Sequence, residues 1–194
     1  MEDYLHAGHS NSQTIANIIY HKTAGNISLC KTAHNLTRKM DKKIDKIKKV
    51  RQFLIEQISE LTDKQLNKIP DGYNNNIIWN LAHLICAQQG ICYLRGGQRA
   101  IVSDKYIAPF FTNTKPERVI DRDEIQEIKH LFISTIDQLQ TDYENKMFSN
   151  YTPSPNIFKV YGIELNDIDD ALEFLLYHEG YHSGYILALR KLVS

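Results

Sequence analysis

The sequence has no excess charge of either sign, since its 194 residues contain 23 Lys and Arg against 23 Asp and Glu. It also has no block of like charges, so neither a global field nor a charged tail recruits nucleic acid or an anionic membrane. A DNA-binding role would need a basic patch that the sequence lacks. Partners must be sought at a local site, and we expect neither nucleic acid nor membrane among them.

Long apolar runs and a secretory signal are also missing. No apolar stretch approaches the ~20 residues that a membrane span requires, and the first residues lack the basic-then-apolar pattern of a signal peptide. The three cysteines, Cys30, Cys86 and Cys92, form no Cys-x-x-Cys pair. An odd count without a secretion signal argues against a disulfide framework. We therefore expect a cytoplasmic protein with reduced, structural cysteines.

The first 39 residues differ from the remainder because they are polar, rich in Asn, Ser, Thr and His, and without sustained hydrophobic periodicity. From Met40 onward apolar residues recur at positions 44, 47, 50, 54, 58 and 61, which is one stripe of an amphipathic helix. We interpret residues 1–39 as a poorly ordered N-terminal extension or a non-native start, with a mobile, partner-binding arm as the alternative. Residues 40–194 form the predicted domain.

Four helical stretches follow, and the connectors between them hold most of the Pro and Gly. The predicted helices span about 41–61, 77–95, 121–146 and 167–192. Thr62 and Gln65 have the form of a capping box and predict a short additional helix that ends before Pro70. The helix at 77–95 is apolar on nearly every side and should be central and buried. The predicted fold is all-α, a four-helix bundle with long irregular connectors.

Two histidines stand four residues apart on the last predicted helix. His178 and His182 differ by about 40° around the helix axis, so their imidazoles project together and can bind one ion. His83 lies midway along the most buried helix, where an imidazole without a partner would be costly. A lone core histidine is more often hydrogen-bonded than metal-bound, but the pair with a buried third favours a metal. We predict a divalent-metal site there and treat the remaining histidines as solvated: His6, His9, His21, His34 and His130.

The run from His178 to His182 also satisfies the His-Glu-x-x-His pattern of zinc proteases, in which Glu179 would be the general base. Those enzymes usually take their third ligand from downstream, whereas the twelve residues after His182 include no His, Asp, Glu or Cys. We therefore discount the protease and keep Glu179 as a candidate for proton transfer or for positioning the site. Gly180 and Gly184 are interpreted as allowing close packing of a helix or a subunit.

The motif Asn-Ile-Ile-Trp-Asn-Leu-Ala-His ending at His83, followed almost a hundred residues later by His-Glu-Gly-Tyr-His-Ser-Gly-Tyr from His178, resembles the DinB-like (YfiT-like) superfamily. The resemblance covers about residue 40 to the C-terminus. It implies an up-down-down-up four-helix bundle in which one histidine of the second helix and two of the fourth bind zinc or nickel, often in a homodimer. His83, His178 and His182 fill these positions. Characterised relatives include thiol-dependent transferases and a mycothiol-dependent isomerase, while many members have no known reaction.

Three neutral imidazoles leave one open position on zinc or several on nickel, where a bound water becomes more acidic or a thiolate is held as a nucleophile. The leading hypothesis is a metal-dependent enzyme, a thiol transferase or hydrolase, that activates a low-molecular-weight thiol or water against a small-molecule substrate. The alternative is a non-catalytic, metal-stabilised helical-bundle protein with a structural or stress-response role.

Overall fold

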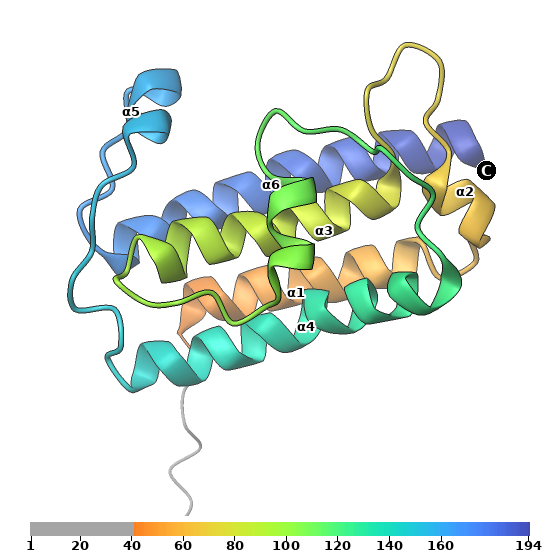
Figure 1. Cartoon of the computed structure of the whole chain (residues 1–194). Coiled ribbons are helices and arrows are strands. Elements are labelled where there is room, and N and C mark those ends of the chain that lie inside the picture. Colours follow the sequence, from red (N-terminus) through yellow and green to blue (C-terminus); the bar gives the residue numbers. More distant parts are fainter. Residues whose placement is uncertain (1–40) are drawn as a thin grey trace, which may run out of the picture. The chain divides into compact units, whose positions relative to one another are not determined.

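The computed structural model of the chain describes residues 41–194. Several sequence-based predictions therefore lie outside the described residues: the extension at 1–39, with Cys30, His6, His9, His21 and His34. Within the described range every regular element is a helix, and no strand is present (Figure 1). The all-α prediction is confirmed.

Four long helices build the fold: α1 (Lys42–Gln57), α3 (Ile77–Gln88), α4 (Arg122–Glu144) and α6 (Ile168–Val193). α1 and α3 each pack against both α4 and α6. Figure 1 shows α1 and α6 running in one direction along the bundle and α3 and α4 in the other. The helix that carries His83 thus lies beside the helix that carries His178 and His182.

Side-chain caps begin the helices at the predicted places. Asn76, Asp121 and Asp167 each accept a hydrogen bond, at 2.9 Å, from the backbone N–H three residues later, and so start α3, α4 and α6. A polar side chain at this position satisfies an N–H that the helix itself leaves unpaired. The capping box of Thr62 and Gln65 also forms and opens the short helix α2 (Asp63–Asn67).

Two helix ends differ from the prediction. α1 ends at Gln57 rather than at 61, although Ile58 in the following turn is still fully buried. The apolar stripe therefore continues past the helix itself. The stretch predicted as one helix over 77–95 is α-helical only to Gln88 and continues as a π-helix, η1 (Gln89–Leu94). A periodicity argument cannot distinguish these two hydrogen-bond patterns over so few residues.

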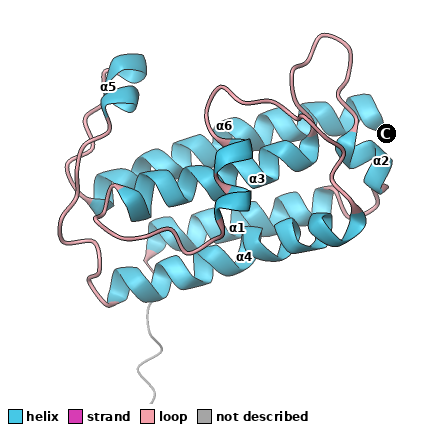
Figure 2. Ribbon diagram, in the orientation of Figure 1, coloured by secondary structure: helices cyan, strands magenta, loops and turns pink. Residues whose placement is uncertain are grey.

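The connectors contain more structure than predicted, as the distribution of helix and loop in Figure 2 shows. A helix, α5 (Pro155–Tyr161), occupies part of the predicted loop before α6, and two short 3₁₀ turns, η2 (Asp104–Tyr106) and η3 (Ala108–Phe110), follow η1. α5 begins with Ser154 as its cap and proline as its first residue, a favourable helix start. The helix is only 7 residues long, too short for a periodic signal.

α3 forms the centre of the core, as its apolar composition predicts. Every residue of this helix except Ala87 is buried. Contrary to the expectation from the sequence, one segment of residues 41–194, Ile77–Leu94, is long and apolar enough to cross a membrane by length and composition, but 78% of it is buried inside the protein. This burial marks it as the core helix of the bundle. Cys86 and Cys92 are free and buried, as expected of structural thiols.

Candidate metal centre

The three predicted ligands meet between α3 and α6. One nitrogen from each of His83, His178 and His182 lies within 4.8 Å of the others. The ring centroids are 4.6 Å apart for His178 and His182, 4.7 Å for His83 and His182, and 5.3 Å for His83 and His178. Within 41–194 no second group of three His, Cys, Asp or Glu side chains is arranged in this way.

Hydrogen bonds set the tautomers of two of these histidines. The Nδ1 of His83 donates to the backbone carbonyl of Phe110 at 2.8 Å. The Nδ1 of His182 donates to the Oδ1 of Asn80, also at 2.8 Å. The Asn80 amide is itself oriented, because its Nδ2 donates to the carbonyl of Asn76 at 2.7 Å. With a proton on Nδ1, each neutral ring carries its lone pair on Nε2, the arrangement that an outer acceptor gives to a metal-binding histidine.

His178 has a different surrounding, since its Nδ1 is buried and no described residue hydrogen-bonds to it. A buried nitrogen without a partner costs free energy. Coordination through this atom would remove the deficit. The donor set of three imidazoles, two with oriented lone pairs and one with an unpaired buried nitrogen, therefore fits a divalent metal.

The three histidines are held in their neutral forms. Burial lowers the pKa of His178 to about 3, and His83 and Arg51 add to the effect. Burial likewise lowers the pKa of His182 to about 2, with help from His178 and His83. For His83, burial lowers the pKa against the opposing effect of the Phe110 carbonyl. Neutral imidazole is the form that binds a metal, so the protonation state of the cluster at neutral pH is compatible with metal binding.

Aromatic rings surround the cluster. Trp79 stacks on His83 with a centroid distance of 4.9 Å and an angle of 7° between the planes. Tyr181 contacts His182 edge-on at 5.2 Å, and Phe174 lies 6.4 Å from His178. These contacts limit rotation of the imidazoles and keep the surroundings apolar.

A family model described as the DinB superfamily matches residues 46–186. This chain belongs to the DinB superfamily. The matched range contains all three histidines and confirms the resemblance seen in the sequence. No curated protein matches the sequence. DinB membership and the three-histidine cluster are together compatible with a metal-binding protein.

Glu179 does not join the histidine cluster of this DinB chain. Its side chain is fully buried, and its Oε1 accepts from the Nε and Nη2 of Arg51 at 2.9 and 2.6 Å. Burial raises the pKa of the Glu179 carboxyl, while the neighbouring Arg51 guanidinium opposes the rise. Glu179 therefore links α6 to α1, between the two histidines in sequence but not beside them in the cluster. Its role in proton transfer or positioning stays a prediction.

Arg51 is a residue of this DinB fold that sequence reasoning missed. It is fully buried and donates to the carbonyls of Phe132 and Leu84, at 2.8 and 3.2 Å, as well as to Glu179. The sequence did indicate that Arg51 faces the core, because position 51 fits the helical spacing 44, 47, 51, 54, 58 more regularly than position 50 does. An arginine on the core side of a helix indicates a buried acceptor on a neighbouring helix.

Proposed function

We propose that this DinB chain is a metal-dependent enzyme that binds one divalent ion, zinc or nickel, through His83, His178 and His182 and activates a low-molecular-weight thiol or water. The observation that carries the proposal is the set of three neutral imidazoles from two adjacent helices, two of them fixed with Nε2 free. Three protein nitrogens leave at least one coordination position open. When bound there, the metal supplies Lewis acidity that makes a thiol or water a better nucleophile.

The chain's own residues orient the three histidines and restrict the access of water to the cluster. Phe110 and Asn80 keep the protons of His83 and His182 on Nδ1, away from the cluster. His83 and His182 are buried and His178 is partly exposed, so a small molecule reaches the cluster most directly at His178. Tyr181, with 61% of its surface exposed, stands on the same helix beside His182. We propose that the substrate approaches over this part of α6.

Metal content tests the first half of the proposal. Full-length protein is reconstituted with zinc or nickel, dialysed and analysed for metal by elemental analysis. We expect one ion per chain in the wild type and loss of stoichiometric metal in His83→Ala. The matched control is His130→Ala, because His130 is exposed on α4 and outside the cluster. Wild-type protein without stoichiometric metal after reconstitution would refute the metal site.

Turnover tests the second half. Metal-loaded protein is incubated with low-molecular-weight thiols and an aromatic electrophile, and thioether formation is followed over time. We expect a rate above that of chelator-treated protein and of His178→Ala, with the His130→Ala control at the wild-type rate. Hydrolysis of activated esters is measured in parallel, with water as the nucleophile. If the protein binds stoichiometric metal but turns over neither the thiols nor the esters, the catalytic proposal is contradicted, while the proposed metal site is not.

One observation favours the non-catalytic alternative. The cluster joins α3 to α6, so a bound ion would cross-link two helices of the bundle and stabilise the folded chain whether or not it reacts. A structural site with all coordination positions filled by protein would show metal binding and stabilisation with no exchangeable ligand. Binding of a thiol to cobalt-substituted protein, seen as a charge-transfer absorption band, would exclude that alternative.

A further inference from the structure

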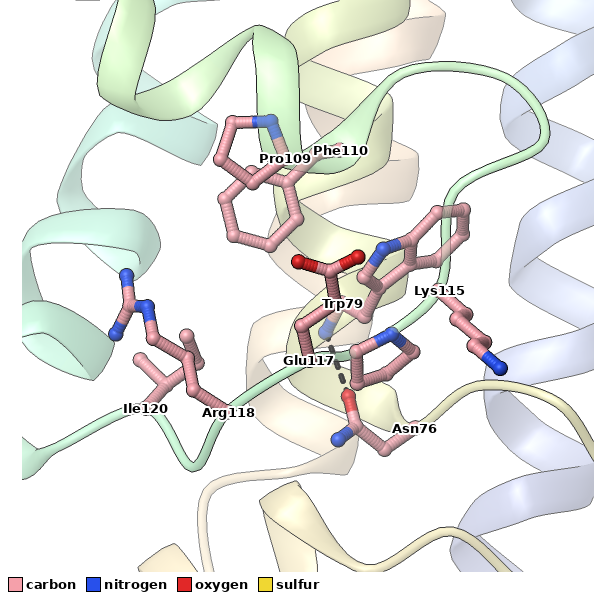
Figure 3. A pocket seen from close by; sticks show the side chains of 9 residues that line it. Asn76, Trp79, Pro109, Phe110, Lys115, Glu117, Arg118 and Ile120 are labelled. Atoms are coloured by element: carbon pink, nitrogen blue, oxygen red, sulfur yellow. Dashed lines mark hydrogen bonds between the residues drawn. The ribbon is translucent and has the colours of Figure 1, made fainter.

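A cavity lies at the start of α3, beside the connector that leads to α4. Its volume is about 300 Å³, and none of the three clustered histidines lines it. Figure 3 shows the cavity from close by; its lining residues come from two separate parts of the chain and include Asn76, Trp79, Phe110, Lys115, Glu117 and Arg118. A cavity of this size is at the lower end of the range of small-molecule sites.

An unpaired donor stands in the wall of this cavity. Trp79 is only 5% exposed, and its indole Nε1–H has no hydrogen-bond acceptor among the described residues. In Figure 3 the indole nitrogen is on the edge of the ring that faces Phe110 and Glu117 across the cavity. A buried N–H without an acceptor is rare in folded proteins. An oxygen atom of a bound molecule would supply the missing acceptor.

The charges of the lining residues select against a charged ligand. Arg118 is paired with Glu124, to which it donates two hydrogen bonds of 2.7 Å. Lys115 and Glu117 form no ion pair with any residue in 41–194, so the lining carries one unpaired charge of each sign and no net charge. The remaining surface is largely apolar, with the rings of Trp79 and Phe110 facing the space. A flat, uncharged molecule matches this combination.

We propose that this cavity binds an uncharged aromatic carbonyl compound, whose ring lies against Trp79 and Phe110 and whose carbonyl oxygen accepts from the Trp79 indole N–H. The proposed binding of this compound does not rest on the proposed metal function. The cavity lies next to the histidine cluster, because Trp79 stacks on His83 and the Phe110 carbonyl accepts from the same imidazole. A ligand there would contact two of the residues that orient His83.

The chain offers a direct probe, since Trp79 is its single tryptophan and gives one indole N–H signal in a proton–nitrogen NMR spectrum. Metal-free, nitrogen-15-labelled full-length protein is titrated with acetophenone and, in parallel, with α-methylstyrene, in which a CH₂ group replaces the carbonyl oxygen. We expect acetophenone to shift the indole proton downfield with saturation. We expect it to bind roughly 3- to 10-fold more tightly than α-methylstyrene, the value of one neutral hydrogen bond.

Charged analogues and one variant complete the test. Benzoate and benzylammonium should each bind more weakly than acetophenone. Trp79→Phe keeps an aromatic ring but removes the donor, so saturation-transfer NMR should show acetophenone and α-methylstyrene binding with equal affinity. If this variant does not fold, the comparison of acetophenone with α-methylstyrene on wild-type protein still tests whether the carbonyl oxygen accepts from the indole N–H. An indole signal that stays unmoved by acetophenone, or moves equally with α-methylstyrene, overturns the proposal. Because the protein is metal-free, neither result depends on the metal site.

Discussion

Asn80 determines which nitrogen of His182 faces the cluster, although it binds no metal itself. Its Oδ1 accepts from the Nδ1 of His182, and its amide is fixed by donation to Asn75 and Asn76. Residues that orient a metal-binding imidazole typically change metal affinity by 10- to 100-fold when removed. At the scale of single residues, the affinity of the cluster for a metal should therefore depend on the hydrogen-bond partners of the histidines as well as on the histidines themselves.

Removing the acceptor should weaken the metal site without removing a ligand. We expect Asn80→Ala to lower zinc affinity by roughly 10- to 100-fold, measured by calorimetric titration. Asn75→Ala is the matched control, because it deletes only an acceptor of the Asn80 amide and leaves the bond to His182 in place. Equal affinities for wild type and Asn80→Ala would show that His182 is oriented by packing alone.

The lowered histidine pKa values predict acid sensitivity of the metal-free protein. With folded pKa values of about 3 for His178 and about 2 for His182 against an unfolded value near 6.5, the unfolded chain binds more protons below pH 6.5. The histidines therefore impose no penalty above pH 6.5, and stability falls as the pH drops below it. We expect a loss of roughly 2–3 kcal/mol between pH 7.5 and 5.5.

Urea unfolding in chelator at several pH values measures this slope. The control is the double variant His178→Asn, His182→Asn, whose replaced side chains do not titrate. Its stability should vary less over the same range. A wild-type slope no steeper than that of the double variant would mean that the imidazoles accept protons in the folded state.

The buried pair of Arg51 and Glu179 gives a third prediction at this scale. Removing one member leaves the other charged group buried without its partner, so Arg51→Leu should lower the free energy of unfolding by about 3–5 kcal/mol. The control is Arg122→Ala, which breaks an exposed ion pair with Asp63 and should cost less than about 1 kcal/mol. Urea unfolding compares the two.

The double variant Arg51→Leu, Glu179→Leu distinguishes a lost ion pair from lost packing. Because it leaves no unpaired charge, it should recover part of the stability lost in Arg51→Leu. If the double variant is less stable than the single one, the volume and hydrogen bonds of Arg51 at the centre of the bundle matter more than its charge.

At the scale of the helices, the sequence predicts elements wherever one physical signal is strong. The start of α3 and both ends of α4 and α6 were predicted within about two residues, because apolar spacing and a capping side chain at Asn76, Asp121 or Asp167 coincide. α5 was not predicted, because so short a helix has little hydrophobic periodicity. The π-helical turn after Gln88 was not predicted either, because an α-helix and a π-helix differ in their hydrogen bonds and not in their amino-acid composition. Contacts between distant segments, such as Phe110 with His83, are set by the tertiary fold alone.

The glycines of α6 provide a prediction for this helix. Gly180 and Gly184 lie on an exposed side. Among the described residues, apart from the chain neighbours and the backbone of α6 itself, no atom is within 4 Å of the position that a Cβ would occupy at either. Each glycine lowers helix propensity by up to about 1 kcal/mol relative to alanine. We therefore expect Gly180→Ala and Gly184→Ala each to raise the free energy of unfolding by up to that amount, measured by urea unfolding.

The same variants examine the predicted homodimer. If the glycines pack against a second copy of the chain, the alanine substitutions would instead weaken association, and sedimentation equilibrium would show a shift from dimer to monomer. Stabilisation with no change in the oligomeric state would place any dimer contact elsewhere on the surface.

At the scale of the whole molecule, a metal bound at the histidine cluster would couple metal binding to folding. His83 comes from α3 and the other two histidines from α6, so the site exists only when these two helices are packed together. A metal that binds the folded chain and not the unfolded one stabilises it by about 2.7 kcal/mol at a concentration 100 times its dissociation constant. For a domain of this size, that corresponds to a rise in melting temperature of roughly 5–10 °C.

Thermal unfolding with and without zinc should therefore show a rise of roughly that size in the wild type, reversed by chelator. Removal of the proposed ligand His178, as His178→Ala, should abolish the metal-dependent rise. His130→Ala should keep it in full, because that side chain is exposed and outside the cluster. A rise of equal size in His178→Ala would show that the ion stabilises the bundle from another site. No rise in the wild type, with stoichiometric metal present, would show that the unfolded chain binds the ion equally well.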